Sequence, residues 1–217
     1  MIYFTADTHF WHFNIIGHSQ RPVFPGVTAG KVPGWCSREE ASIKMNELLI
    51  ERWNSKITNN DIVYFLGDFA FCGKDKAIEI LEQLNGEKHW ILGNHDTQLA
   101  KKVGVFFEEV TDYMVLRVHD KNENEVQYHQ PIVLMHYPIL SWDGMHHKTW
   151  HLHGHSHGNL RGPQGYRLDV GVDTSNLYPY SYDDVKSIFK AREALAANVG
   201  LPLMQHVDHH VAKENNV

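Results

Sequence analysis

The sequence lacks the features that mark several large classes of protein. It contains only two cysteines, Cys36 and Cys72, and their spacing suggests neither a disulfide framework nor a cysteine-based zinc site. No apolar run approaches the ~20 residues that a membrane-spanning helix requires. The chain also reaches Asp7 without the apolar core of a signal peptide. We therefore expect a cytoplasmic protein with free thiols and no membrane partner.

Positive charge is also scarce. Twenty lysines and arginines stand against 26 aspartates and glutamates, which gives a net charge of -6 with histidine neutral, and no basic run stands out. Because proteins that bind extended nucleic acid normally present a basic face, such a partner is possible but not favoured. An acidic chain that handles phosphates must supply positive charge locally, and bound metal ions do so. The one excess in the composition is histidine, with 17 residues.

The order of the predicted elements indicates an α/β protein. Strands are expected at 1–7, 61–67 and 86–93, and the stretch 9–38 is expected to be irregular. One helix is expected to start at Ser37, and two more are expected to span 75–84 and 97–103. A final helix is expected from Ser181 to about Ala197. The second half is rich in short strands, expected at 105–110, 113–118, 125–128, 132–135, 150–153 and 166–170.

Helix-linked strands followed by strand-rich pairing predict a four-layer α/β/β/α sandwich, with two mixed sheets face to face and helices outside. A chain of 217 residues with 42% hydrophobic residues fits a single domain, 1–217. Within that domain, residues 203–217 form a polar stretch that we expect to be a flexible tail.

Residues able to bind metal follow five of the apolar, strand-like runs. Because open α/β sheets bind ligands beyond the carboxyl ends of their strands, these residues are expected to converge. Single members have plainer readings, since aspartate often caps a turn and a lone histidine is usually structural. The clusters are Asp7-x-His9, Gly67-Asp68, Gly93-Asn94-His95-Asp96, His136, and Gly154-His155-Ser156-His157.

Taken in this order, the five clusters resemble the calcineurin-like metallophosphoesterase superfamily. Its pattern is D-x-H, G-D, G-N-H-[D/E], H and G-H-x-H, and every block is present here in the same order. D-x-H alone would be a weak signal, but the five together are specific. The blocks span residues 7 to 157, roughly two thirds of the chain, and the chain is similar to the small single-domain bacterial or phage-type members.

The resemblance implies a dinuclear metal site. One metal would be held by Asp7, His9 and His157, the other by Asn94, His136 and His155, and both by Asp68. A metal-bridging hydroxide would attack the phosphorus in line, without a covalent intermediate. His95 would bind the scissile phosphate and protonate the leaving oxygen, with Asp96 orienting its imidazole. The mixed oxygen and nitrogen ligands favour manganese, iron, nickel, cobalt or zinc over magnesium. Of these metals we expect manganese first.

Residues near the ligands in sequence are candidates for substrate binding. His12 and Asn14 follow the first ligand pair, and Arg21 is the nearest arginine that could clamp a phosphate, although a surface salt bridge suits it equally. Trp142 follows His136 in a segment rich in groups that stack on bases, but it could instead belong to the core.

Other histidines and aspartates have plainer interpretations. His151 and His153 share strand parity with His155, so we expect them to pack in the core or to support the ligands. Asp169 and Asp173 are expected to serve in turns or to support the site. The tail histidines at 206, 209 and 210 are expected to be solvated.

Three functions are compatible with the site. The favoured one is hydrolysis of a small phosphoester, more specifically a phosphodiester or nucleotide, by a metal-dependent phosphoric ester hydrolase. A nuclease or nucleic-acid end-processing enzyme would use the same metals. A catalytically silent scaffold would have lost ligands or the catalytic histidine, whereas His95 and all seven ligands are intact here. The sequence leaves the oligomeric state, natural substrate and native metal open.

Overall fold

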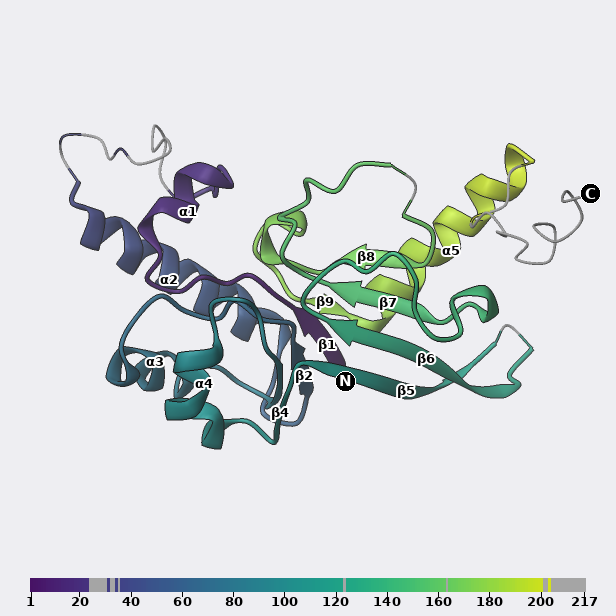
Figure 1. Ribbon diagram of the computed structural model, residues 1–217, viewed down its shortest axis with the longest axis horizontal. Helices are drawn as coiled ribbons and strands as arrows, with labels where there is room; N and C mark the ends of the chain where they lie inside the picture. Colours follow the sequence, from purple (N-terminus) through teal and green to yellow (C-terminus); the bar gives the residue numbers. More distant parts are fainter. Residues whose placement is uncertain are drawn as a thin grey trace, which may run out of the picture.

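Two mixed β-sheets form the centre of the protein (Figure 1). The computed structural model describes residues 1–23, 31, 34, 36–122, 124–162, 164–200 and 203. The first sheet has the order β4-β3-β2-β1-β9, in which only β9 runs antiparallel to its neighbour. Its strands are β1 (Ile2–Thr5), β2 (Ile62–Phe65), β3 (Glu87–Ile91), β4 (Glu109–Thr111) and β9 (Tyr180–Ser181).

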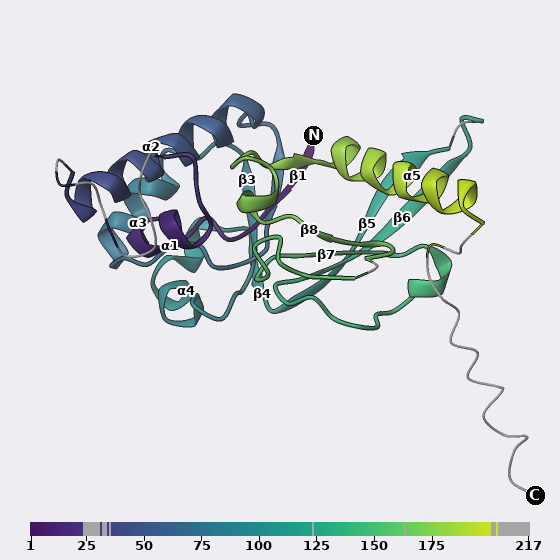
Figure 2. The same cartoon turned by 90° about the horizontal axis from the view of Figure 1, so that it is seen from above.

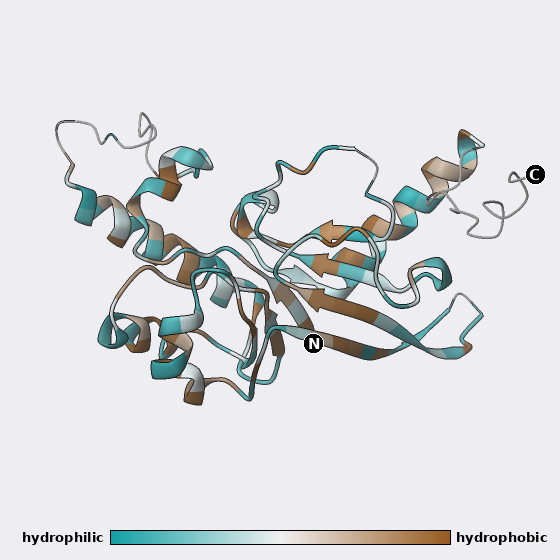
Figure 3. Ribbon diagram, viewed as in Figure 1, coloured by the Kyte–Doolittle hydropathy of each residue, from teal (hydrophilic) through white to brown (hydrophobic). Residues whose placement is uncertain are grey.

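The second sheet has the order β5-β6-β7-β8. An antiparallel hairpin of β5 and β6 is followed by the parallel pairs β6–β7 and β7–β8. Hydrophobic residues concentrate in the carboxyl-terminal half of β6, whereas the part of β6 nearest the tip of the hairpin is hydrophilic (Figure 3). The strands are β5 (Tyr113–Lys121), β6 (Gln127–Met135), β7 (Trp150–His153) and β8 (Arg167–Asp169).

Helices flank the sheets, as the sequence predicts (Figure 2). α1 to α4 lie on the side of the first sheet that faces away from the second sheet, and Phe189 of α5 packs on Trp150 and Tyr166 of the second-sheet region. The helices are α1 (Phe13–His18), α2 (Arg38–Lys56), α3 (Lys74–Leu81), α4 (Thr97–Val103) and α5 (Tyr182–Asn198). Short 3-10 turns are η1 (Gly104–Phe106), η2 (Met145–His147) and η3 (Val172–Thr174).

Strand alternation divides the core into two clusters. Val63 and Phe65 of β2 face the helices, in a cluster that contains residues of α2 and α3. Tyr64 and Leu66 point the other way and pack with residues of the second sheet, including Leu134. The first sheet is therefore covered on both faces, which is why its central strands β1 and β2 are almost continuously apolar.

The helix starts predicted at Ser37 and Ser181 are confirmed by complete capping boxes. Ser37 accepts a hydrogen bond from the backbone N–H of Glu40, whose carboxylate accepts one from Ser37 in return. Ser181 and Asp184 repeat the arrangement at the start of α5.

Three local predictions differ from the structure. The stretch 9–38 contains a short helix, α1, which forms because it buries Phe13, Ile15 and Ile16. The expected strand at 105–110 is instead η1 followed by β4. The expected strands 125–128 and 132–135 form one strand, β6, across Pro131. Proline is tolerated there because pairing with β7 starts only at Ile132, so β6 has a single neighbour at that point.

Most of the expected tail lies outside the described residues, 203 being described and 204–217 not. No helix within the described ranges is long and apolar enough to cross a membrane.

Candidate metal centre

The strand ends bring the predicted ligands together into two groups. Donor atoms of the first group all lie within 4.8 Å of one another, and the same holds for the second group. Asn94 joins the second group, because its Oδ1 is 3.2 Å from Nε2 of His136. The first group is Asp7, His9 and His157, and the second is Asp68, His136 and His155.

Asp68, a member of the second group, also approaches the first group. Its Oδ2 is 3.6 Å from Nε2 of His9 in the first group and 3.6 Å from Nε2 of His136 in the second. Its Oδ1 accepts a hydrogen bond of 3.1 Å from the backbone N–H of His95. One carboxylate oxygen therefore stands at equal distance from a ligand nitrogen on either side.

Five of the seven candidate ligands have left-handed backbone conformations. Their φ angles are +56° at Asp7, +49° at His9, +57° at Asp68, +66° at His155 and +46° at His157. Aspartate and histidine enter this region more readily than most residues, but it remains uncommon and costs roughly 1–2 kcal/mol per residue. Strain of this kind gathers at functional sites, where the surrounding structure holds it in place.

The donors suit divalent cations. Nε2 of His9 is buried and has no hydrogen-bond partner among the described residues. Burial, together with the nearby charge of Arg21, holds the pKa of His9 far below its ordinary value, so the ring is neutral, the state in which histidine binds metal. Burial also raises the pKa of Asp7, and a cation would offset that cost. Two aspartates, four histidines and one asparagine fit a pair of transition-metal ions.

Comparison with known proteins identifies the family. The model of the calcineurin-like phosphoesterase family matches residues 1–214. This chain belongs to the calcineurin-like phosphoesterases. The match extends well beyond the motif blocks at 7–157 and includes β8, β9 and α5.

Relatives of this phosphoesterase include archaeal and phage proteins. An uncharacterized protein of Methanocaldococcus jannaschii, MJ1445, is 33% identical over 206 residues, which is 91% of this chain and 96% of that protein. The gene 66 protein of Mycobacterium phage L5 is 28% identical over 153 residues, covering 58% of this chain and 72% of its own. The crystal structure of a protein of unknown function from Aquifex aeolicus, AQ665, covers 87% of this chain and 98% of its own. It has a TM-score of 0.57 at 22% identity, and so shares the fold.

Glycines let the ligand loops of the phosphoesterase approach closely. Gly67 makes a turn with φ of +91°, and a Cβ there would lie 2.5 Å from the backbone nitrogen of Gly93. At Gly154 a Cβ would lie 2.6 Å from Oδ2 of Asp7. Gly67 therefore permits a sharp turn before its ligand, whereas Gly93 and Gly154 make room for neighbouring carboxylates.

A buried aspartate supports the first group. Oδ2 of Asp173 is 2.6 Å from Nδ1 of His157, which leaves Nε2 of that ring to bind a cation. Burial alone would lower the pKa of His157, but its hydrogen bond to Asp173 and the charge of Asp7 raise it overall. Sequence reasoning left Asp173 between a turn role and this supporting role.

Arg21 is part of the same support and not the predicted phosphate clamp. Its side chain is buried, and its Nε donates to Oδ1 of Asp173 at 2.8 Å. Its two terminal nitrogens donate to the backbone carbonyls of Asp7 at 2.6 Å and Thr8 at 2.7 Å. Buried behind the ligands, the guanidinium fixes the first ligand loop and is not presented to solvent.

Asp169 fixes the loop that carries His155 and His157. Its Oδ2 accepts hydrogen bonds from Oγ of Ser156 at 2.7 Å and from the backbone N–H of Gly158 at 2.8 Å. The backbone N–H of His155 meanwhile donates to both oxygens of Asp7, at 2.9 and 3.1 Å. The two ligand groups are thereby joined through the backbone as well as through Asp68.

Asp96 differs from its expected role as the partner of His95. Its carboxylate is buried and accepts four hydrogen bonds, three of them at Oδ2, over distances of 2.7 to 3.2 Å. The carboxylate therefore ties the β2 and β3 loops together, and burial raises its pKa against the opposing effect of the backbone donors. The donors are the backbone N–H groups of Asp68, Phe69 and Gly93 and the indole N–H of Trp90.

One exposed aromatic residue at the site, Phe71, was not predicted from the sequence. The Phe71 ring is 4.1 Å from the His12 ring and 4.7 Å from the His95 ring, measured between centroids. Nδ1 of His12 is in turn 3.4 Å from Nδ1 of His9, so the predicted substrate residue His12 does lie at the centre. The available signal was a large apolar residue in a loop, three positions after Asp68.

The remaining predicted substrate residues lie elsewhere. Asn14 is exposed on α1, and within the described structure it makes no hydrogen bond to a ligand side chain. Trp142 is buried in the core, the alternative to base stacking that the sequence left open, and its indole N–H donates to the carbonyl of Thr149 at 2.9 Å. Its ring lies 5.2 Å from His151, which is itself fully buried, as predicted.

Proposed function

We propose that this phosphoesterase hydrolyses a small, nucleotide-sized phosphodiester with two divalent metal ions, manganese being the first choice. The observation that carries the proposal is the position of Asp68, with one carboxylate oxygen 3.6 Å from a histidine nitrogen of each ligand group. A bridging carboxylate is what a pair of metal ions requires. Iron, nickel, cobalt and zinc suit the same donors.

Each group would hold one ion. When bound, the pair would neutralise charge on the phosphate and supply a hydroxide near neutral pH. The chain contributes rigidity, because Asp173 and Arg21 fix the first group and Asp96 fixes the loop of Asp68. The first ion would take Asp7, His9, His157 and Asp68, and the second Asn94, His136, His155 and Asp68.

His95 is proposed as the general acid. Its side chain is exposed beside the ligands, and its backbone N–H is tied to Oδ1 of Asp68. It would bind the phosphate and donate a proton to the leaving oxygen. Phe71, packed at 4.7 Å, would orient the ring in place of the carboxylate expected from sequence.

Exposed aromatic rings support a nucleotide-sized substrate. Phe71 is 38% exposed on the side of the first group, and Tyr137 is 39% exposed, with its ring 4.8 Å from that of His155 in the second group. Such rings stack on bases. A net charge of -6 argues against a long nucleic acid strand. The free cysteines Cys36 and Cys72 are consistent with the cytoplasmic location that we propose.

Metal-free protein supplied with Mn²⁺ would test the proposal. We expect cleavage of bis-p-nitrophenyl phosphate to exceed that of p-nitrophenyl phosphate, and to be lost in Asp68→Asn together with paired metal binding. Asp112→Asn, at an exposed aspartate, is the matched control and should behave as wild type. Two metals per chain in Asp68→Asn would refute the bridging role.

The alternatives give different results. Faster cleavage of single-stranded oligonucleotides than of small diesters, with binding that weakens steeply as salt rises, would indicate a nuclease. A protein that holds two metals and cleaves none of these substrates would be a scaffold.

A further inference from the structure

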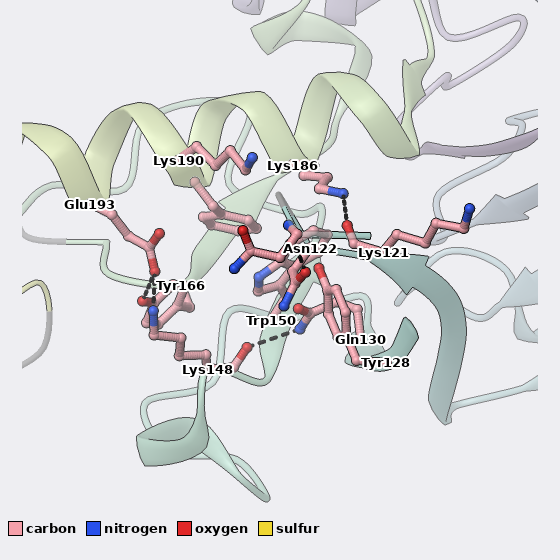
Figure 4. A pocket seen from close by; sticks show the side chains of 12 residues that line it. Lys121, Asn122, Tyr128, Gln130, Lys148, Trp150, Tyr166, Lys186, Lys190 and Glu193 are labelled. Carbon is pink, nitrogen blue, oxygen red and sulfur yellow. Dashed lines mark hydrogen bonds and ion pairs between the residues drawn. The ribbon is translucent and has the colours of Figure 1, made fainter. Parts of the chain in front are cut away.

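A cavity of about 500 Å³ lies between the second sheet and α5 (Figure 4). It opens among the tip of the β5–β6 hairpin, the start of β7 and the side of α5. Trp150, at the start of β7, lines it, whereas the candidate ligand His155 follows the other end of that strand. Five residues of extended chain span on the order of 15 Å, so this cavity is separate from the metal centre.

Positive charge concentrates around this cavity. Four lysines and a single glutamate line it, an excess of positive charge in a chain whose net charge is -6. Lys121 and Lys190 stand at the β5–β6 and α5 sides, and Lys148 rises from the loop before β7 (Figure 4). A basic rim on an acidic protein favours an anionic ligand.

The rim lysines differ in how firmly they are held. Lys186 donates to Oδ1 of Asp120 at 2.7 Å, and Oδ2 of the same carboxylate accepts the hydroxyl of Tyr128 at 2.8 Å. This network fixes one charge at the wall. By contrast, Lys121 and Lys148 pair with Glu125 and Glu193 at 2.9 and 2.8 Å, with lysine side chains 55% and 69% exposed. Exposed pairs of this kind are weak, so either lysine could turn to an anionic ligand.

The floor of the cavity is aromatic. The Trp150 and Phe189 rings are 5.0 Å apart, and the Tyr166 and Phe189 rings 5.9 Å apart, each measured between centroids. All three side chains are buried, so the floor is rigid. Gln130 adds a polar group to the wall, fixed by its donation to the carbonyl of Lys148 at 2.9 Å.

We propose that this cavity binds a nucleoside phosphate. Its base would lie toward the aromatic floor and its phosphates against the lysine rim, apart from any substrate at the metal centre. A volume of about 500 Å³ is in the range of small-molecule sites and exceeds what inorganic phosphate alone would fill. The combination of an apolar floor and a cationic rim fits a ligand with a flat ring at one end and negative charge at the other.

Calorimetric titration of the metal-free 217-residue chain in excess EDTA tests this, with ADP as the probe. We expect one ADP per chain, and adenosine and inorganic pyrophosphate at least about tenfold weaker, because each lacks one half of the recognised group. Lys121→Gln/Lys148→Gln should weaken ADP binding by about tenfold or more at unchanged melting temperature. Lys101→Gln/Lys102→Gln, an exposed pair on α4 with the same charge change, is the matched control and should bind ADP as wild type does.

Several outcomes would overturn the proposal. Undetectable ADP binding at millimolar concentration, or equal binding in Lys121→Gln/Lys148→Gln and wild type, would show that the cavity is not the site. Equally tight pyrophosphate would show an anion site without base recognition. Loss of ADP binding in Asp68→Asn would place the nucleotide at the metal centre instead.

Discussion

Replacing Asp96 with asparagine separates the role that the structure gives this residue from the one its position beside His95 suggests. Oδ2 of Asp96 accepts three N–H groups and Oδ1 a fourth. An asparagine of the same shape carries only one oxygen. If that oxygen faces the three donors, the NH₂ group meets the backbone N–H of Phe69; in the opposite orientation it meets all three.

The magnitude follows from these contacts. A hydrogen bond to a charged group contributes about 1.5–3 kcal/mol, and a buried donor left without an acceptor costs about 1–3 kcal/mol. In Asp96→Asn, one of the four hydrogen bonds is lost and the other three go to a neutral oxygen in place of a charged one. We therefore expect the free energy of unfolding to fall by about 3–5 kcal/mol. Because the backbone of Asp68 is held by this carboxylate, metal affinity should fall as well.

Urea unfolding of the metal-free protein measures the first effect and chelator competition the second. Asp112→Asn, at an exposed aspartate, should change the unfolding free energy by less than about 0.5 kcal/mol. An Asp96→Asn variant with wild-type stability and wild-type metal binding but slow turnover would refute this reasoning. Asp96 would then act on the imidazole of His95 after all.

Three further predictions concern single side chains. His95→Asn should keep both metals and slow turnover by about 10²–10⁴-fold, and wild-type activity would place the acid elsewhere. Asp173→Asn should weaken metal binding by about 10–100-fold in chelator competition, because His157 loses its carboxylate partner; unchanged affinity would contradict that support. Burial lowers the pKa of His151 from 6.5 to about 4. Its neutral form therefore contributes stability that is lost as pH falls from about 6.5 toward 4, by about 3 kcal/mol at most. His151→Gln should make the acid-side loss in urea unfolding of the metal-free protein shallower, whereas an unchanged pH profile would exclude this residue.

The convergence of the candidate ligands within each sheet could be predicted because it depends on strand direction. Carboxyl ends of parallel strands meet at one edge of a sheet, so residues after β1, β2 and β3 had to lie together. The histidines after β6 and β7 follow the same rule in the second sheet. The remaining step was that the two sheets meet at this edge, and only the family resemblance supplied it.

Residues that support the ligands could not be predicted in this way. Arg21 and Asp173 are separated by 152 positions, and no periodicity connects them. Asp96 shows the opposite failure, since it adjoins His95 in sequence but its carboxylate points to the backbone behind the ligands. Closeness in sequence shows which residues share a loop. The direction in which a loop side chain points depends on the hydrogen-bond donors of neighbouring loops, which closeness in sequence does not show.

A turn role alone does not explain why the left-handed positions 7 and 68 carry aspartate. Glycine would relieve the backbone strain at either position, but it offers no oxygen to a cation. The structure instead keeps the side chains and holds the strained backbone with hydrogen bonds, from the Asp7 N–H to the Gly67 carbonyl at 2.9 Å and from the His9 N–H to the Asp68 carbonyl at 3.0 Å. The first two ligand loops thus brace each other through Gly67 and three candidate ligands, Asp7, His9 and Asp68. The strained backbone and the positions of the candidate ligands therefore depend on the same residues. A change that relieved the strain would also displace the ligand side chains.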